Sequence, residues 1–230
     1  MSQLKYQKSI VNKESFSYLE FDEIFEKKKL QLAMKRVFDI IVSFIGLIVL
    51  TPIILIIGMA IKIDSKGPVF FKQVRVGKDG KEFRIFKFRT MVVDAEKKGM
   101  QITVGKDSRI TKVGNFLRKS KLDELPQLIN VLVGNMSFVG PRPEVPKYVA
   151  MYDEEQRAIL KVRPGITDLA SIEYKDENYL LSLSENPEKI YIEEIVPKKI
   201  YLNSKYLQEI SLLYDVKIII RTIIAIIAIK

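Results

Sequence analysis

A run of 22 uncharged residues, Ile40 to Ile61, is the feature that most limits how this chain can fold. As one straight helix, with a rise of about 1.5 Å per residue, the run would extend roughly 33 Å, and the hydrocarbon core of a bilayer is about 30 Å thick. Basic residues lie on both sides of the run, so positive charge does not favour one orientation. The length of the run predicts a membrane helix, which we place at residues 37–63.

Pro52 lies near the middle of this run, where it removes one helical hydrogen bond and favours an extended conformation at Thr51. A break there leaves arms of roughly 14 and 11 residues, each too short to cross a bilayer. A re-entrant helix that dips into the membrane and returns to the same face fits both the proline and the symmetric charges. A kinked helix that spans the bilayer stays open, because spanning helices tolerate proline.

The composition excludes several kinds of chemistry, because the chain has no histidine, cysteine or tryptophan. Ser-His-Asp and Cys-His nucleophile systems, zinc sites built on thiolate or imidazole, and disulfides are therefore ruled out. Any reaction must use carboxylates, lysine, arginine, tyrosine, hydroxyls, or a hard cation such as Mg²⁺ bound by oxygen.

The net charge of +10 predicts an anionic partner: an acidic membrane leaflet, a phosphorylated substrate or nucleic acid. No stacked aromatic platform and no recognition-helix pattern supports nucleic acid, so we expect none. An excess of lysine that only keeps the chain soluble is the alternative.

The chain is long enough for one core, and we expect an α+β fold that is mainly helical. Residues 1–32 are interpreted as a loosely attached N-terminal extension, and residues 33–230 as a single domain. Two runs rich in aromatic and branched residues, 69–76 and 81–88, predict a small β-hairpin around a glycine-containing turn. Residues 210–230 mix apolar and charged side chains and predict an amphipathic interfacial helix; a buried core helix is the alternative.

The densest chemistry begins at Asp123 and Glu124. The apolar spacing of residues 122–134 predicts a short helix, and Pro126 is compatible only with its first turn. Asp123 would then lie at or near the N-cap, where free N–H groups and the helix dipole keep a carboxylate ionised and attract phosphate. The alternative is that Asp123 only caps the helix.

Two arginines lie in stiff loops bounded by proline: Arg142, between Pro141 and Pro143, and Arg163, just before Pro164. An arginine on rigid backbone suits fork-like contact with a diphosphate, because it loses less freedom on binding. A surface ion pair remains the alternative for any single arginine.

Seven short stretches share their residues and order with a known family: Lys35–Ile40, Gly67–Phe71, Phe86–Met91, Asp107–Thr111, Leu122–Leu128, Met136–Pro143 and Val162–Thr167. In these the chain resembles the bacterial sugar transferases, the monotopic phosphoglycosyl transferases, and in particular the small members that consist of the catalytic body alone. The resemblance covers about residues 33 to 228. No single stretch is decisive, but seven in register are highly specific.

The resemblance implies that Asp123 and Glu124 are the catalytic pair, that the membrane helix is broken at Thr51 and Pro52 and returns to the cytoplasmic side, and that Mg²⁺ is the cofactor. The mechanism we hypothesise makes Asp123 the nucleophile and Glu124 a ligand of the metal. Cations are then needed to offset the charge of the substrates. The substrate-binding residues expected from the motifs are Lys87, Arg118, Pro141, Arg142, Pro143 and Arg163.

Family members move a sugar 1-phosphate from a UDP-sugar to undecaprenyl phosphate and release UMP, as the first membrane step of capsule, exopolysaccharide, O-antigen or glycoprotein synthesis. The resemblance thus implies a place on the cytoplasmic face of the bacterial inner membrane, with UDP-sugar, polyprenyl phosphate and membrane lipid as partners; a homo-oligomer is left open. One departure is Asp168, where many relatives have glycine, and it puts the sugar pocket in doubt. The competing hypotheses are a membrane-anchored module that binds anionic lipid without catalysis and a lipid diphosphate hydrolase.

Overall fold

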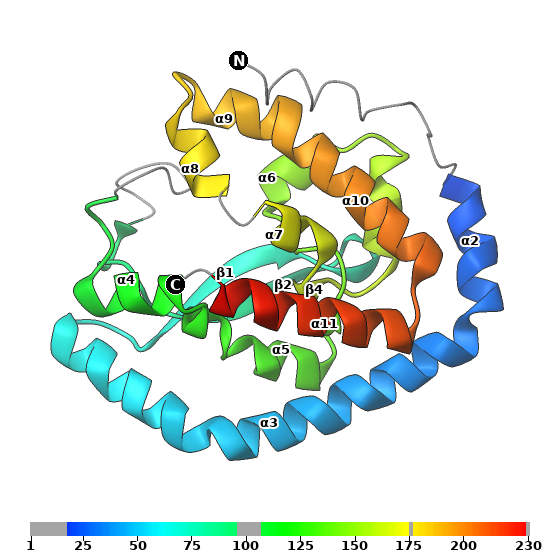
Figure 1. Ribbon diagram of the computed structural model, residues 1–230. Helices are drawn as coiled ribbons and strands as arrows, with labels where there is room; N and C mark the ends of the chain where they lie inside the picture. The colour runs from blue at the N-terminus through cyan, green and yellow to red at the C-terminus, as the bar shows by residue number, and fades with distance from the viewer. Residues whose placement is uncertain (1–17, 96–106, 175–176, 229–230) are drawn as a thin grey trace.

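The computed structural model describes residues 18–95, 107–174 and 177–228, and its fold is α+β and mainly helical, as the sequence predicts (Figure 1). The helices and strands are α2 (Tyr18–Lys27), α3 (Lys29–Asp64), β1 (Phe70–Val76), η1 (Lys78–Gly80), β2 (Glu82–Phe88), α4 (Lys112–Lys119), η3 (Leu122–Glu124), α5 (Gln127–Val133), β3 (Ser137–Val139), α6 (Pro146–Val149), η4 (Gln156–Lys161), β4 (Gly165–Thr167), α7 (Leu169–Glu173), α8 (Glu177–Ser182), α9 (Pro187–Ile190), the π-helical turn η5 (Tyr191–Ile195), α10 (Val196–Glu209) and α11 (Leu212–Ile227).

The predicted hairpin is confirmed: β1 and β2 are antiparallel, with Val76 opposite Glu82 at the turn. Gly80 takes a positive φ of 74°, which glycine adopts without strain. On β2, Ile85 packs toward α5, whereas Phe88 packs against α3 and α4. The strand is therefore held from both faces, and this fixes the positions of the basic side chains that it carries.

Helix α3 forms the lower edge of the molecule and bends in its middle part, so that both of its ends turn toward the body (Figure 1). The expected interruption at Thr51 and Pro52 does not occur, because the helix continues through both residues. The Thr51 hydroxyl donates a hydrogen bond of 2.6 Å to the Leu47 carbonyl, four residues earlier, a contact that often bends a helix. The carbonyl that Pro52 leaves without its helical donor is that of Ile48, and apolar membrane helices tolerate proline.

The surface of α3 is mostly apolar and uncovered. Its most apolar 18-residue window is only 11% buried, and the helix is long and apolar enough to cross a membrane by length and composition. A core helix of a soluble protein would be mostly buried. The side of α3 that faces the body instead buries polar residues at intervals of four: Lys35, Asp39 and Ser43.

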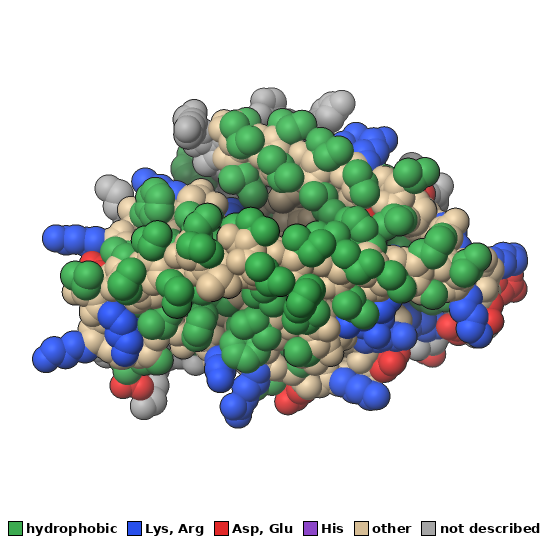
Figure 2. Space-filling model, turned by 90° about the horizontal axis from the view of Figure 1, so that it is seen from below, with side chains coloured by type: hydrophobic (Ala, Val, Ile, Leu, Met, Phe, Trp, Pro, Cys, Tyr) green, Lys and Arg blue, Asp and Glu red, His purple; other side chains and the backbone are tan. Residues whose placement is uncertain are grey.

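The predicted C-terminal helix is confirmed as α11, which begins after Ser211, whose side chain caps it through the Tyr214 N–H. Ile218 is fully buried, whereas Leu213 and Ile224 are exposed, so the helix is neither a core helix nor detached. Seen from below, exposed apolar side chains cover much of one face of the molecule, with lysines and arginines around the rim (Figure 2).

A buried polar cluster fastens α3 to α10 and α11. The Lys35 ammonium donates to the Val139 carbonyl (2.9 Å) and forms an ion pair with Asp215. The Tyr206 hydroxyl donates to the other Asp215 oxygen (2.7 Å). Because a buried ion pair loses much of its value when its geometry changes, these contacts fix how α3 lies against the body.

The other end of α3 is fastened by Arg89. Its guanidinium donates to the carbonyls of Ser65 and Lys66, each at 2.7 Å, and so satisfies acceptors beyond the last helical turn. At Gly67, where φ is 130°, a Cβ would lie 1.8 Å from Arg89 Nη1, so this contact needs glycine.

Residues 18–32 are not the loose extension that the sequence predicted. Phe21 of α2 is 1% exposed and belongs to the main core, and Asp22 pairs with Lys161 at 2.7 Å. The mixed composition of this segment gives no sign that Phe21 is buried, or that Ile24 and Phe25 pack against the same core. The part of the predicted extension before residue 18 lies outside the described residues.

A second sheet of two short parallel strands was not predicted. It pairs β3 with β4, with Ser137 opposite Gly165 and Val139 opposite Thr167. Strands of three residues give no periodic signal. The pairing brings together two distant motifs and holds the loop that contains Arg142.

Candidate functional site

Asp123 and Glu124 lie in the 3₁₀ turn η3, just before α5 and beside strand β2. The predicted N-cap position of Asp123 is corrected, because Lys121, with φ of 58°, precedes the turn and Pro126 is the N-cap of α5. Neither of these residues makes a side-chain cap. Asp123 is 7% exposed and lies inside the turn, so it is not a capping residue.

Glu124 is held by two cations. Lys87 Nζ donates to its Oε1 at 2.9 Å, and Arg142 donates through Nη2 to Oε1 at 2.5 Å and through Nη1 to Oε2 at 3.5 Å. Burial alone would raise the pKa of Glu124, but Arg142 and Lys87 together hold it well below its usual range. Glu124 is therefore ionised at neutral pH and fixed in position.

Asp123 is in the opposite situation. Its Oδ1 is buried and accepts no hydrogen bond from the described residues. Burial raises the pKa of Asp123 above its ordinary value, against the lowering effect of the nearby Lys87. The sequence predicted that a helix N-terminus would stabilise the ionised carboxylate of Asp123. Burial instead makes its ionised form less favourable. A partly desolvated carboxylate is more basic and a better nucleophile once it has lost its proton.

Arg118, at the end of α4, also belongs to this cluster. Its Nε donates to Thr90 Oγ1 at 3.0 Å, and Asp123 lies near enough to counteract part of the lowering that burial imposes on the pKa of Arg118. Burial also lowers the pKa of Lys87, against the effect of Glu124. The structure therefore brings together Asp123, Glu124, Lys87, Arg118 and Arg142, as the sequence predicts.

The loop of Pro141, Arg142 and Pro143 is supported from two sides. Gly165 N–H donates to the Pro141 carbonyl at 3.0 Å, and Arg75 Nη1 donates to the Pro143 carbonyl at 3.1 Å. The two prolines are buried. This backbone holds the Arg142 guanidinium where Glu124 can pair with it.

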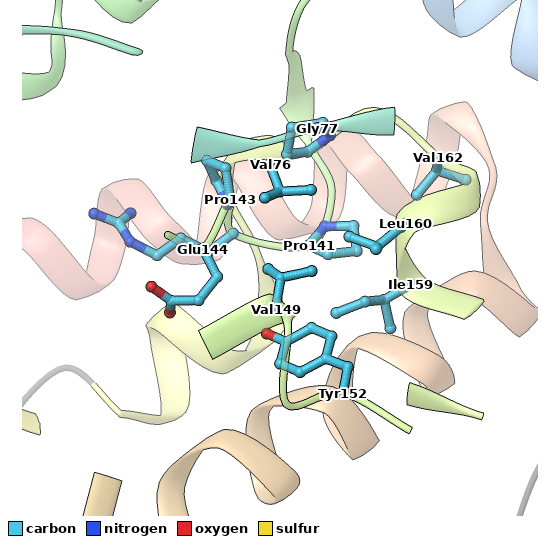
Figure 3. A pocket seen from close by; sticks show the side chains of 12 residues that line it. Val76, Gly77, Pro141, Pro143, Glu144, Val149, Tyr152, Ile159, Leu160 and Val162 are labelled. Atoms are coloured by element: carbon cyan, nitrogen blue, oxygen red, sulfur yellow. The ribbon is translucent and has the colours of Figure 1, made fainter. Parts of the chain in front are cut away.

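Behind this loop lies a small cavity with a largely apolar lining (Figure 3). Val149, Ile159 and Leu160 point into it, and the carboxylate of Glu144 points away from them. The cavity lacks the convergent polar groups that would orient a nucleotide sugar, so we interpret it as packing that supports the loop.

Arg163 is not brought to this cluster. Its Nε donates to the Gly134 carbonyl at 2.9 Å, at the opposite end of α5 from Glu124. Arg36 lies beside it and donates to the carbonyls of Val131 (2.6 Å) and Leu132 (2.9 Å). Both arginines thus bind the C-terminal carbonyls of α5. Contact of Arg163 with a substrate stays a prediction.

Asp168, the departure from the common glycine, causes no strain. Its φ of −157° is extended backbone that any residue adopts. Its carboxylate accepts from Ser171 N (2.9 Å) and from Ser171 Oγ (2.6 Å), so that Asp168 is the N-cap of α7.

The site also contains polar residues that sequence reasoning missed. Arg75 pairs with Glu144 at 3.2 Å, and the Tyr191 hydroxyl donates to the same carboxylate. Arg75 alternates with apolar residues in a strand, which is the ordinary pattern of an exposed position, so no signal marked it as half-buried and paired.

The acidic pair is compatible with Mg²⁺. Over the described residues no group of three or more acidic, histidine or cysteine side chains could hold a metal ion. Mg²⁺ is commonly bound by only one or two carboxylates, with phosphate oxygens and water completing the octahedron. The unpartnered Oδ1 of Asp123 beside Glu124 supplies such hard oxygen donors. Glu124 already has two cationic partners, so its role as the metal ligand stays a prediction.

Comparison with known proteins places the chain in a family. A family model described as bacterial sugar transferase matches residues 30–229. The UDP-glucose:undecaprenyl-phosphate glucose-1-phosphate transferase of Klebsiella pneumoniae is 42% identical over 203 residues, which cover 84% of this chain and 40% of the relative. The chain likewise spans 39% of a protein of the same description from Escherichia coli (strain K12).

Shorter relatives match more of their own length. The exopolysaccharide production protein PSS of Rhizobium leguminosarum bv. phaseoli is 38% identical over 203 residues, which cover 85% of this chain and 96% of the relative. A putative undecaprenyl-phosphate N-acetylgalactosaminyl 1-phosphate transferase of Bacillus subtilis (strain 168) is 45% identical over 130 residues, 56% of this chain and 73% of the relative. These matches confirm the resemblance seen in the seven motifs: the chain belongs to the bacterial sugar transferase family.

Proposed function

We propose that this chain transfers a sugar 1-phosphate from a UDP-sugar to polyprenyl phosphate and releases UMP. The observation that carries the proposal is the buried Asp123 carboxylate, whose Oδ1 has no partner among the described residues, beside Glu124 and its two cations. The descriptions of the relatives name a sugar-phosphate transfer to undecaprenyl phosphate, which is the reaction this arrangement suits.

In the first half-reaction, an Asp123 oxygen forms a bond to the phosphorus next to the sugar. The bond from that phosphorus to the bridging diphosphate oxygen breaks, and UMP leaves with the electron pair. An aspartyl phosphosugar remains. Burial makes the Asp123 carboxylate more basic than an exposed one, which favours this attack.

In the second half-reaction, an oxygen of the lipid phosphate attacks the same phosphorus and the aspartate is released as a carboxylate. Substrates and nucleophile are all anionic, so fixed cations are needed. Lys87, Arg118 and Arg142 surround the acidic pair and hold positive charge without reorganising.

We propose Mg²⁺ as the cofactor, held by oxygens of Asp123 and Glu124. When bound, such an ion neutralises charge on a diphosphate and polarises its oxygens. Lys87 and Arg142 would then share Glu124 with the metal.

We also propose that the apolar face seen in Figure 2 lies in the cytoplasmic leaflet of the bacterial inner membrane. The body contacts α3 near its start through Lys35 and after its end through Arg89. A helix that spans a bilayer can meet a water-soluble body on one side of the membrane only at one end. The contacts at both ends therefore favour a re-entrant arrangement over a spanning one.

The test is to incubate the full chain with Mg²⁺ and a panel of UDP-sugars and to measure UMP, first without and then with polyprenyl phosphate. We expect a burst of UMP, stoichiometric with the protein, without lipid, and continuous turnover with lipid. Asp123→Asn should lower turnover by about 10³-fold or more, because the amide is a poor nucleophile.

Asp79→Asn is the matched control, because Asp79 lies in the hairpin turn with φ of 58°, a conformation that asparagine tolerates. It should keep full activity. If Asp123→Asn also keeps full turnover, the covalent route is wrong. Release of inorganic phosphate in place of UMP would indicate the hydrolase, and salt-sensitive binding to anionic vesicles without turnover would indicate the non-catalytic module.

A further inference from the structure

A second hollow lies between α7 and α10 and is lined in part by Arg142, the residue that pairs with Glu124. Its lining includes Arg142, Asp168, Ser171, Lys199 and Asn203. The cavity volume is about 30 Å³, and the empty space that includes open solvent is about 380 Å³. The cavity has room for one or two small polar groups but not for a whole hexose ring.

Most polar groups around the hollow already have partners. Both Asp168 oxygens accept hydrogen bonds from Ser171. Lys199 pairs with Glu177 and lies over the Tyr191 ring, 5.2 Å from its centroid. These groups support the wall of the hollow and have little capacity left for a ligand.

Asn203 has a buried acceptor that is still open. It is 4% exposed, and its side-chain oxygen Oδ1 accepts no hydrogen bond from the part of the chain that the structure describes. A buried acceptor without a donor is costly, so a group that donates to it is expected in the working state. Asn203 lines the hollow, so the hollow is the space from which a donor would approach this oxygen.

The position of the hollow identifies the donor. In the proposed reaction the sugar is attached to the phosphorus that Asp123 attacks, so its ring lies within a few bonds of that phosphorus. Arg142, which pairs with Glu124 next to Asp123, is then close to the sugar. Arg142 pairs with Glu124 and also lines the hollow, together with Asp168, so this one side chain connects the acidic pair with the hollow.

We propose that Asn203 determines sugar specificity: a hydroxyl or acetamido N–H on the hexose of the UDP-sugar enters this hollow and donates a hydrogen bond to Asn203 Oδ1. The inference rests on the proposed function for the identity of the substrate. It adds a residue to the site and assigns the class of group that the residue recognises.

Asn203→Leu keeps the size of the side chain and removes the acceptor, whereas Asn203→Asp keeps an acceptor at the same place. Gln208→Leu, an amide-to-leucine change at a half-buried position of the same helix, is the matched control. Because Asn203→Leu removes an unpartnered buried oxygen, we expect its melting temperature to be no lower than that of the wild type.

The first measurement is the affinity of the full chain for UDP and for each of a panel of UDP-hexoses and UDP-N-acetylhexosamines. For the sugar that the wild type binds best, Asn203→Leu should lose about 5- to 10-fold in affinity, with UDP affinity unchanged. Asn203→Asp and Gln208→Leu should keep most of the preference. The inference is overturned if Asn203→Leu keeps the wild-type ratio of UDP-sugar to UDP affinity, or if both affinities fall together.

The second measurement is UMP release over the same panel, in which Asn203→Leu should raise KM for the preferred sugar more than it lowers kcat. The two proposals fail separately. If the wild type releases no UMP but Asn203→Leu still removes the sugar preference in binding, the transferase proposal is wrong and the sugar contact stands. If Asn203→Leu releases UMP and ranks the UDP-sugars in the same order as the wild type, the inference about Asn203 is wrong and the transferase proposal stands.

Discussion

Basic residues from other elements lie at both ends of helix α5, but their partners differ. Before the first turn, Lys87 and Arg142 pair with the carboxylate of Glu124. At the other end, Arg36 donates to carbonyls of the last turn and Arg163 donates to the Gly134 carbonyl that follows it. The first pair holds positive charge beside the acidic pair, whereas the second completes the hydrogen bonding of a helix end. Two arginines in similar proline-bounded loops thus have different surroundings.

Among the basic residues at the two ends of α5, the largest effect is expected from Arg142→Met, which removes the main cation that keeps Glu124 ionised. We expect kcat/KM for UMP release to fall by about 10²-fold, the usual cost of one group that stabilises transition-state charge. The pKa of Glu124 should rise, because Arg142 is the strongest influence that lowers it.

Arg142→Lys is the control for this variant, since lysine keeps the charge but loses the fork of two donors, and it should recover part of the rate. If kcat/KM of Arg142→Met stays within a few-fold of the wild-type value, Lys87 and Arg142 contribute no more to catalysis than Arg36 and Arg163 do.

The next effect is a shift in pH dependence from Lys87→Met. The nucleophile must be ionised, so activity is lost as the pH falls through the pKa of Asp123, and burial has already raised that pKa. Lys87 is the strongest opposing influence. Its removal should raise the pKa further, so that activity is lost at a higher pH than in the wild type.

The measurement is the acidic limb of kcat/KM against pH for the wild type, for Lys87→Met and for Lys119→Met, an exposed residue at the end of α4. Lys119→Met should leave the limb in place. A limb that stays fixed or moves to lower pH in Lys87→Met would contradict the assignment of Asp123 as the ionised nucleophile.

The smallest effect is expected from Arg163→Met. It removes a charged donor from the Gly134 carbonyl, but it also removes the repulsion that contributes to the lowered pKa of Arg36. Because Arg163 is only half-buried, we expect a loss of about 1 kcal/mol in the free energy of unfolding. Activity should stay within about 3-fold, as for a substitution outside the reacting groups.

Denaturant unfolding and UMP release on the same sample measure both quantities. A large fall in kcat/KM with unchanged stability would restore Arg163 to the substrate-binding role that its loop suggested, and would remove the contrast between the two ends of α5.

Much of this site could be predicted because its residues lie in short local motifs. The apolar run, the hairpin and the Asp-Glu pair depend on neighbours in the sequence, and the structure has each of them. The continuity of α3 through Pro52 could not be predicted, because local rules favour a break at an internal proline, whereas the helix continues through it.

The remaining features depend on contacts between distant residues. The pairing of β3 with β4 is made by residues 137–139 and 165–167, too short to show a period. The burial of Phe21 and the different surroundings of Arg142 and Arg163 follow from which element packs against each residue. The effect of burial on Asp123 also required the structure, since its sequence position indicated a helix cap.

The cluster of Lys35, Asp215 and Tyr206 affects which lipid phosphates could reach Asp123 in the proposed reaction. It joins α3 and α11, the helices proposed to face the membrane, rigidly to the body, so the distance of Asp123 from the proposed bilayer surface is fixed. Such a protein would select acceptors by the depth at which their phosphate is presented. A short-chain, water-soluble phosphate could then be a poor substrate even if it is chemically identical at the reacting atom.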